Sequence, residues 1–294
     1  VNRFLTAKLR EYAIRLRAMV TRRVASEDIA KAKDEMLGEV FKVLSVHFGA
    51  VPNPNTTFEW AMTDKHKVFK REQLTPLGFY KDLVSVKADQ MVSIINDPRN
   101  PYYKLYSVSY LGNVAGGAAI RYINLPIGEL KASARYAVAT LDKGEPCWMG
   151  VDVFKSYHTD LGILDTNMYD HDLVYGVSPG MTKEERLRSG ESLMSHAMVF
   201  TGYDKRDGEE YPNKWRVENS WGEARGNKGY YLMTNAWFEE YLFQARDRFV
   251  VVNKAILNKG LLPLLEEEPI MLPAWDPMGS LAAVGREPEG SSSG

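Results

Sequence analysis

The stretch from His196 to Gly229 constrains the fold most, because it joins two strand-like segments through a polar turn. The first segment reads His-Ala-Met-Val-Phe-Thr-Gly and the second Trp-Arg-Val-Glu-Asn-Ser-Trp-Gly. The connection between them is rich in Asp, Gly, Glu and Pro. Such a pattern is typical of an antiparallel hairpin or meander. It predicts neighbouring strands that place one imidazole, His196, and one carboxamide, Asn219, near their ends.

This pair suits general base catalysis. A histidine that accepts a proton in a reaction needs one tautomer and one ring orientation. The Asn219 oxygen can accept from one ring N–H without adding a charge, and we expect Trp221 to cover that hydrogen bond. Such a base serves a cysteine whose thiolate attacks a carbonyl group. The alternative is that His196 is a core histidine and Asn219 an unrelated turn residue. This alternative accounts well for His196 alone but poorly for the two residues together.

Composition limits the class of protein. The 294 residues carry a net charge of −1, so the chain as a whole is not built to bind nucleic acid or acidic membranes. A single cysteine, Cys147, excludes a disulfide framework within the chain and favours a reducing, cytoplasmic compartment. No apolar run approaches the roughly 20 residues that span a bilayer, so no membrane partner is expected.

The predicted secondary structure changes near residue 96, where Asn96-Asp97-Pro98 is typical of a turn. Before it, helices are predicted over residues 2–20, from a Ser26 cap to Phe48, and from a Thr75 cap to about residue 84. The first hundred residues therefore look helical. The later residues look mostly β, with strands at 103–110, 120–123, 148–153 and 249–252, helices at 126–141 and 237–244, and an irregular segment at 155–190.

The first predicted helix is basic. In and just after this helix there are seven basic residues and one acidic residue, Glu11. The basic residues are Arg3, Lys8, Arg10, Arg15, Arg17, Arg22 and Arg23. A solvated helix face is the simpler interpretation. The alternative is a basic surface that binds nucleic acid or an acidic partner.

Several long motifs resemble the bleomycin hydrolase branch of the papain-like cysteine peptidases. Asn219-Ser220-Trp221-Gly222 resembles the asparagine motif of those peptidases, and its surroundings resemble the branch. The matching stretches are Met168–Val174, Gly190–Met198, Lys214–Glu223, Gly229-Tyr230 and Glu268–Gly279. The resemblance runs from about residue 1 to about residue 283.

The resemblance implies an α+β, papain-like fold with three parts. Residues 1–100 would be a helical inserted region for oligomerisation, 101–262 the β-barrel half carrying His196 and Asn219, and 263–294 a C-terminal arm and disordered tail. It further implies a cysteine aminopeptidase that forms a homo-hexamer. This enzyme would hydrolyse N-terminal peptide bonds or peptide-like amides, without a metal or organic cofactor.

The nucleophile of this branch lies N-terminal to the motifs above, so the resemblance implies a catalytic cysteine upstream of Val1. Cys147-Trp148 imitates the Cys-Trp pair of the family, but Cys147 follows Pro146 into a predicted strand instead of beginning a helix. It also lies only 49 residues before His196, against about 130–150 in papain-like enzymes. We therefore interpret Cys147 as a small buried residue. If no cysteine segment precedes Val1, the alternative function is an inactive binding or assembly module, with at most weak nucleic-acid binding.

The end of the chain departs from the resembled branch. There, the chain stops a few residues after a Met-Gly pair, and this arm occupies the active-site cleft so that only a free N-terminus fits. The matching residues here are Met278, Gly279, Ser280, Leu281 and Ala282, but the chain continues from Ala283 to Gly294. We expect that extension to be disordered and to be trimmed or to obstruct substrate.

Overall fold

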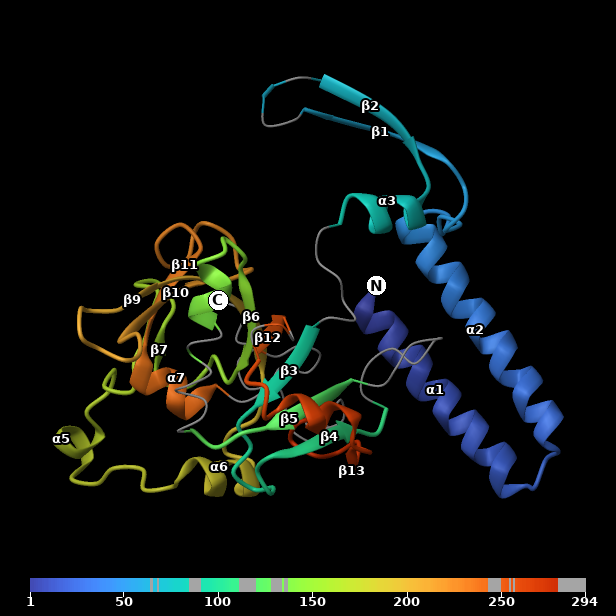
Figure 1. The fold of residues 1–294 in the computed structure, drawn as a ribbon. Helices are drawn as coiled ribbons and strands as arrows, with labels where there is room; N and C mark the ends of the chain where they lie inside the picture. The colour runs from blue at the N-terminus through green and yellow to red at the C-terminus, as the bar shows by residue number, and fades with distance from the viewer. Residues whose placement is uncertain are drawn as a thin grey trace. The chain divides into compact units, whose positions relative to one another are not determined.

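In this computed structural model, the structure describes residues 1–63, 66–67, 69–84, 91–110, 120–127, 134, 137–242, 250–253, 255 and 257–279. The chain divides into two compact units, Val1–Val86 and Lys87–Gly294 (Figure 1). The sequence suggested a boundary at residue 100. Strand β3 (Met91–Ile95) nevertheless falls in the second unit, where it pairs with two strands of a sheet.

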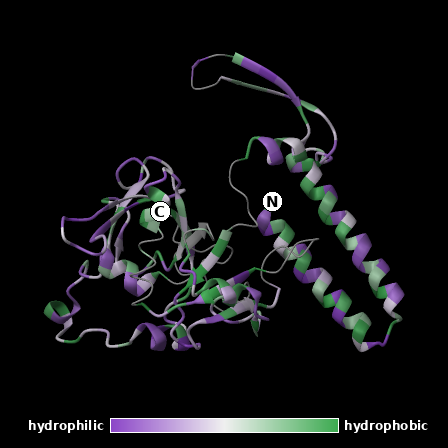
Figure 2. Cartoon of the chain, viewed as in Figure 1, coloured by the Kyte–Doolittle hydropathy of each residue, from purple (hydrophilic) through white to green (hydrophobic). Residues whose placement is uncertain are grey.

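Two antiparallel helices, α1 (Asn2–Thr21) and α2 (Ser26–Phe48), begin the first unit. Tyr12 of α1 and Met36 of α2 are buried, and the Tyr12 hydroxyl donates to Glu39 at 2.5 Å. Both helices carry hydrophobic and hydrophilic residues along their length (Figure 2). The predicted Ser26 cap is wrong: Ser26 is the first helical residue, and its side chain makes no capping bond. The helix ends before Gly49, as expected.

A hairpin of β1 (Phe58–Thr63) and β2 (Phe69–Leu74) follows, and then α3 (Pro76–Asp82). The Thr75 hydroxyl accepts from the Gly78 N–H at 2.9 Å, which confirms the predicted cap. The hairpin corrects the expectation that the first hundred residues are helical. Apolar residues alternate in β1, at Phe58, Trp60 and Met62, but β2 has four consecutive polar residues, so the sequence showed no matching pair of alternating strands.

The second unit contains a five-stranded sheet in the order β12-β3-β5-β4-β13. Its strands, besides β3, are β4 (Lys104–Val108), β5 (Arg121–Asn124), β12 (Val250–Asn253) and β13 (Ile270–Leu272). β3 runs parallel to β5 and β13 runs parallel to β4, whereas the other neighbours are antiparallel.

A six-stranded sheet in the order β6-β9-β10-β11-β8-β7 carries the segments that constrained the fold. The predicted hairpin is confirmed, because β9 (His196–Asp204) and β10 (Lys214–Glu218) pair antiparallel. In β10, Trp215 and Val217 are buried while their neighbours are exposed, the alternation of a half-buried strand. The other strands are β6 (Cys147–Val151), β7 (Tyr157–His158), β8 (Ile163–Leu164) and β11 (Tyr230–Thr234).

One apolar core joins the two sheets. Ile94 of β3 and Ile123 of β5 belong to the same buried cluster as Phe200 of β9 and Trp215 of β10. Helix α7 (Asn235–Tyr241) adds Trp237 and Phe238 to this cluster. The aromatic rings of this core fix the position of the β9–β10 hairpin.

The remaining helices are short. The segment predicted as irregular contains β7, β8, α5 (His171–Tyr175) and α6 (Lys183–Ser189), and a 3-10 helix, η3, spans Leu262–Glu266. The helix predicted over 126–141 lies partly outside the described residues; residues 137–141 are helical. Among the described helices, none is both long and apolar enough to cross a membrane.

Candidate active site

The two sheet neighbours of β9 bring His196 and Asn219 together. His196 is the first residue of β9 and pairs with Val151 of β6. On the other side, Glu218, the last residue of β10, pairs with Val199. Asn219 therefore leaves the sheet beside the start of β9. The Nε2 atom of His196 lies 2.7 Å from the Oδ1 atom of Asn219.

The surroundings of Asn219 assign this hydrogen bond. Its Oδ1 atom also accepts from the backbone N–H of Ser220 at 2.8 Å. A backbone N–H can only donate, so the atom facing it is the carbonyl oxygen of the amide. The His196 nitrogen that faces the same oxygen consequently donates. We infer that Nε2 carries the proton and that Nδ1 retains the lone pair that a general base requires.

Trp221 covers this pair. Its ring lies over the His196 ring with centroids 4.9 Å apart and planes inclined by 29°. The Trp221 ring also stacks on Phe154, with centroids 6.1 Å apart, and meets Tyr231 edge-on at 6.2 Å. Asn219 is only 8% exposed. The hydrogen bond is thus shielded from water, which strengthens its electrostatic component.

A glycine-containing loop fixes the backbone of Asn219. The Asn219 N–H donates to the Gly229 carbonyl at 3.0 Å, so the loop between them closes on itself. At Gly226, φ is +58°, and an added Cβ would lie 2.5 Å from the Tyr230 carbonyl oxygen. Only glycine fits this crossing. The loop from Gly226 to Gly229 therefore positions the carboxamide.

A buried carboxylate, that of Asp152, forms hydrogen bonds just before the start of β9. Asp152 follows β6, and its two oxygens accept from the hydroxyls of Ser192 at 2.6 Å and Ser195 at 3.0 Å. Ser195, the residue before His196, also accepts from the Val153 N–H at 3.2 Å. Burial raises the pKa of Asp152, although the serine bonds oppose that rise. We did not identify Asp152, Ser192 or Ser195 from the sequence, because nothing in their spacing showed that they meet.

The predicted arm residues fall into two groups. Met278 is fully buried, and Gly279 follows it in a tight turn. Ser280, Leu281 and Ala282, with the extension to Gly294, lie outside the described residues.

Cys147 lies away from this site. It pairs with Phe200, four positions along β6 from Val151, the partner of His196. Its side chain is fully buried, and burial raises the pKa of the thiol to about 12. These features argue against a nucleophile.

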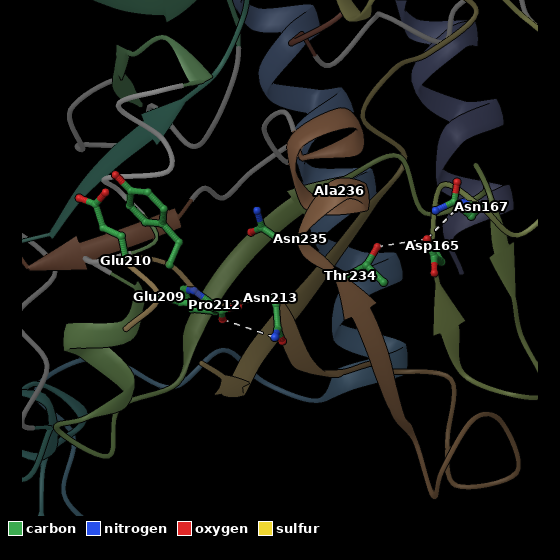
Figure 3. A pocket seen from close by; sticks show the side chains of 10 residues that line it. Asp165, Asn167, Glu209, Glu210, Pro212, Asn213, Thr234, Asn235 and Ala236 are labelled. Carbon is green, nitrogen blue, oxygen red and sulfur yellow. Dashed lines mark hydrogen bonds between the residues drawn. The ribbon is translucent and has the colours of Figure 1, made fainter. Parts of the chain in front are cut away.

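A pocket of about 490 Å³ lies elsewhere in the second unit (Figure 3). Its lining includes Asp165, Glu209, Asn213 and Asn235, and it contains none of the predicted site residues. Within the described part of the chain, no three His, Cys, Asp or Glu side chains are grouped so that they could hold a metal ion.

Residues 1–279 match the Peptidase C1-like family. The chain is 47% identical to the bleomycin hydrolase of Gallus gallus over 289 residues, which cover 96% of this chain and 61% of that protein. Aminopeptidase C of Lactobacillus helveticus is 39% identical over 287 residues, with the same coverage. PepW from Lactobacillus rhamnosis has a similar crystal structure, with a TM-score of 0.83, 42% identity, and coverage of 94% of this chain and 60% of that one. The chain thus spans 61% of the length of these curated relatives. With its α+β, papain-like arrangement, the chain belongs to the Peptidase C1-like family.

Proposed function

We propose that the protein containing this chain is a cysteine aminopeptidase of the bleomycin hydrolase type. The observation that carries the proposal is the 2.7 Å hydrogen bond between His196 and Asn219 beneath Trp221. It leaves His196 Nδ1 free to take a thiol proton and later to deliver it to the leaving amine. The names of the relatives agree with this chemistry.

The attacking thiol in this proposal comes from a cysteine upstream of Val1, because Cys147 is fully buried and pairs with Phe200 in the middle of β9, four residues from His196. Its thiolate attacks the carbonyl carbon of the first peptide bond, and His196 protonates the departing nitrogen. Water then attacks the acyl-enzyme, and His196 takes a proton from that water. The resemblance would have the arm residues restrict substrates to those with a free N-terminus, but Met278 is fully buried in an apolar cluster with Met194, so Met278 itself does not line a cleft.

The test uses the full-length protein and an aminoacyl-coumarin substrate. His196→Ala should lower kcat/KM by at least about 10²–10⁴-fold, since both the base and the activated thiolate are lost. Asn219→Ala should cost less, because the base remains and only its orientation is lost. His47→Ala, an exposed histidine on α2, is the control and should leave the rate unchanged. Near-normal turnover by a folded His196→Ala protein would refute the proposal.

A further inference from the structure

Two buried polar atoms beside the candidate base have incomplete hydrogen bonding. They are the Nδ2 atom of Asn219 and the hydroxyl of Tyr231, the second residue of β11. Within the described part of the chain, neither atom has a hydrogen-bond partner of good geometry. Asn219 is 8% exposed and Tyr231 only 1%, so bulk water is not their partner. Buried polar groups are nearly always paired, and the two atoms are therefore candidates to satisfy each other.

The strand register places these two side chains on one face. Val217 of β10 pairs with Tyr231, and both residues are buried. Asn219 follows Val217 by two residues, and its N–H donates to the carbonyl of Gly229, two residues before Tyr231. Side chains alternate between the faces of a sheet, so the Asn219 carboxamide continues on the face of Val217 and Tyr231. Asn219 and Tyr231 are thus diagonal neighbours across the two chain segments.

Close packing fixes the ring of Tyr231. The Trp221 ring meets it edge-on, with centroids 6.2 Å apart. A Cβ added to Gly226 would lie 3.3 Å from the Tyr231 Cε2 atom, so the glycine-containing loop packs directly on the ring. The Gly226 N–H also donates to the carbonyl of Thr159, in the turn between β7 and β8, at 3.0 Å. The loop therefore holds both the ring and Thr159 in place.

The Tyr231 hydroxyl has two donors directed at it. Burial raises the pKa of Tyr231, and hydrogen bonding to its oxygen by Thr159 and Asn219 opposes that rise. Asn219 can donate only through Nδ2, since an amide oxygen is an acceptor and Oδ1 already accepts from His196. Both approaches fall short of full hydrogen-bond geometry. The carboxamide thus has its oxygen toward the imidazole and its nitrogen toward the phenol.

We propose that Tyr231 is a positioning residue whose hydroxyl holds the Nδ2 atom of Asn219 and so keeps Oδ1 turned toward His196. This inference rests on the proposed aminopeptidase function, and it gives Tyr231 a role that acts through Asn219 rather than on the substrate. Without the hydroxyl, Nδ2 would be a buried donor without a partner, which is costly. The carboxamide would then rotate and loosen its bond to His196.

The first arm of the experiment measures hydrogen exchange of single backbone amides in the full-length protein. The Ser220 N–H donates to Asn219 Oδ1 at 2.8 Å, so its exchange reports the orientation of the carboxamide. Tyr231→Phe, which keeps the ring, should speed exchange of the Ser220 amide by about 10-fold. The Asn219 amide, bonded to the Gly229 carbonyl, should exchange as before. Faster exchange of both amides would mean that the loop had opened as a whole, and faster exchange of neither that the hydroxyl holds nothing; each result would overturn the inference.

The second arm measures kcat and KM of the full-length enzyme with an aminoacyl-coumarin substrate. Tyr231→Phe should lower kcat by about 10-fold and leave KM unchanged, since the hydroxyl orients the base and does not bind substrate. The loss should disappear in an Asn219→Ala background, because the hydroxyl then has no carboxamide to hold. Equal losses in the two backgrounds would contradict the positioning role.

Tyr203→Phe is the matched control. Tyr203 lies in the same sheet, near the other end of β9 from His196, and its hydroxyl donates to Asp142 at 2.7 Å. Its substitution removes a bonded hydroxyl but should change neither Ser220 exchange nor kcat. If Tyr231→Phe does not fold, Thr159→Val removes the other donor to the hydroxyl and should shift both readouts the same way; unchanged readouts there would overturn the inference.

The outcomes separate this inference from the proposed function. Faster Ser220 exchange with full activity in Tyr231→Phe would overturn the positioning role and leave the aminopeptidase proposal standing. A full-length wild type without peptidase activity would refute the proposed function and the catalytic part of the inference together. In that case the exchange arm would still decide whether Tyr231 holds the Asn219 carboxamide.

Discussion

At the residue scale, the reactivity of a thiol depends on where its strand places it. Cys147 and Trp148 imitate a catalytic pair in the sequence, yet Cys147 points into the core and pairs far along β9 from His196. Burial disfavours the thiolate, which is the reactive form. The local sequence therefore resembles a catalytic Cys-Trp pair, but the burial of the Cys147 side chain disfavours a catalytic thiolate.

The 294-residue chain contains one cysteine, so its alkylation can be followed directly. With a pKa of about 12, the Cys147 thiolate fraction at pH 8 is about 10³-fold below that of an ordinary thiol. We expect iodoacetamide to leave the native chain unmodified while it labels the same chain in guanidinium chloride, as measured by intact mass. Equal labelling rates in the two conditions would contradict this expectation.

At the element scale, Lys183 joins two short helices. It is the first residue of α6, and its ammonium donates to the carbonyls of Glu239 and Leu242 at the end of α7, at 2.9 and 2.7 Å. A cation at a helix C-terminus is favourable. Burial is nevertheless the dominant effect, and it lowers the pKa of Lys183 from 10.5 to about 7, although Glu240 opposes this shift.

This lowered pKa predicts a pH dependence of stability. Between about pH 7 and 10.5 the unfolded chain holds more protons on Lys183 than the native chain does. The contribution of Lys183 to the free energy of unfolding should therefore rise with pH across that window. Thermal unfolding of the wild type minus that of Lys183→Met should show this rise, whereas Lys205→Met, at an exposed lysine, should unfold in parallel with the wild type. A wild-type minus Lys183→Met difference that is flat from pH 7 to 10 would count against the buried ammonium.

At the scale of the whole molecule, the first unit exposes apolar side chains in a regular pattern. Leu37, Phe41, Leu44 and Phe48 of α2 recur at helical spacing and are 37–75% exposed. Such a stripe on a surface typically marks an interaction site. The basic character of α1 is partly offset, because Lys8 pairs with Glu11 and Glu39. Nucleic-acid binding by this helix remains a prediction.

We propose that the full-length protein assembles as a homo-hexamer and that the α2 stripe contributes to its contacts. Phe41→Glu should lower the mass measured by sedimentation, since a charge would then be buried in the interface. Glu35→Lys, an exposed position on another face of α2, is the control and should leave the mass unchanged. A monomeric wild type would refute the proposal.

The sequence alone predicted the β9–β10 hairpin, the pairing of His196 with Asn219 and the place of Trp221 over that pair. Strand alternation and turn residues are local signals, and both catalytic candidates lie within one hairpin. The resemblance to papain-like peptidases added the α+β class. The β1–β2 hairpin was missed because only β1 shows apolar alternation, whereas β2 has four consecutive polar residues.

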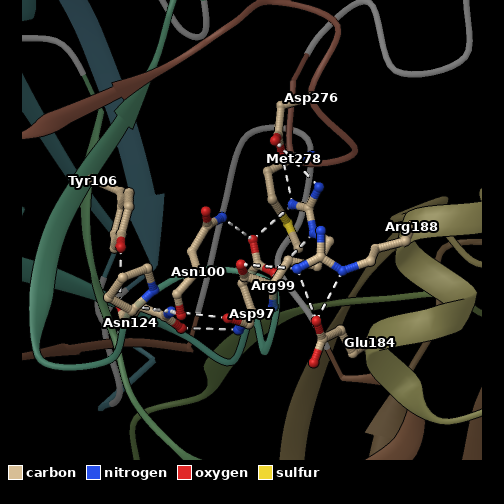
Figure 4. Close-up of polar contacts among 10 residues, drawn as sticks. Asp97, Arg99, Asn100, Tyr106, Asn124, Glu184, Arg188, Asp276 and Met278 are labelled. Carbon is tan, nitrogen blue, oxygen red and sulfur yellow. Dashed lines mark hydrogen bonds and ion pairs between the residues drawn. The ribbon is translucent and has the colours of Figure 1, made fainter.

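Only the tertiary structure decided which distant residues meet. The buried ion pair of Arg99 and Asp276 joins residues 177 positions apart (Figure 4), and Asp152 meets Ser192 and Ser195 across about forty positions. No periodicity encodes such contacts, because they depend on how the two sheets and the C-terminal segment pack. A buried charge is tolerated where partners satisfy it, and those partners become known only when the chain has folded.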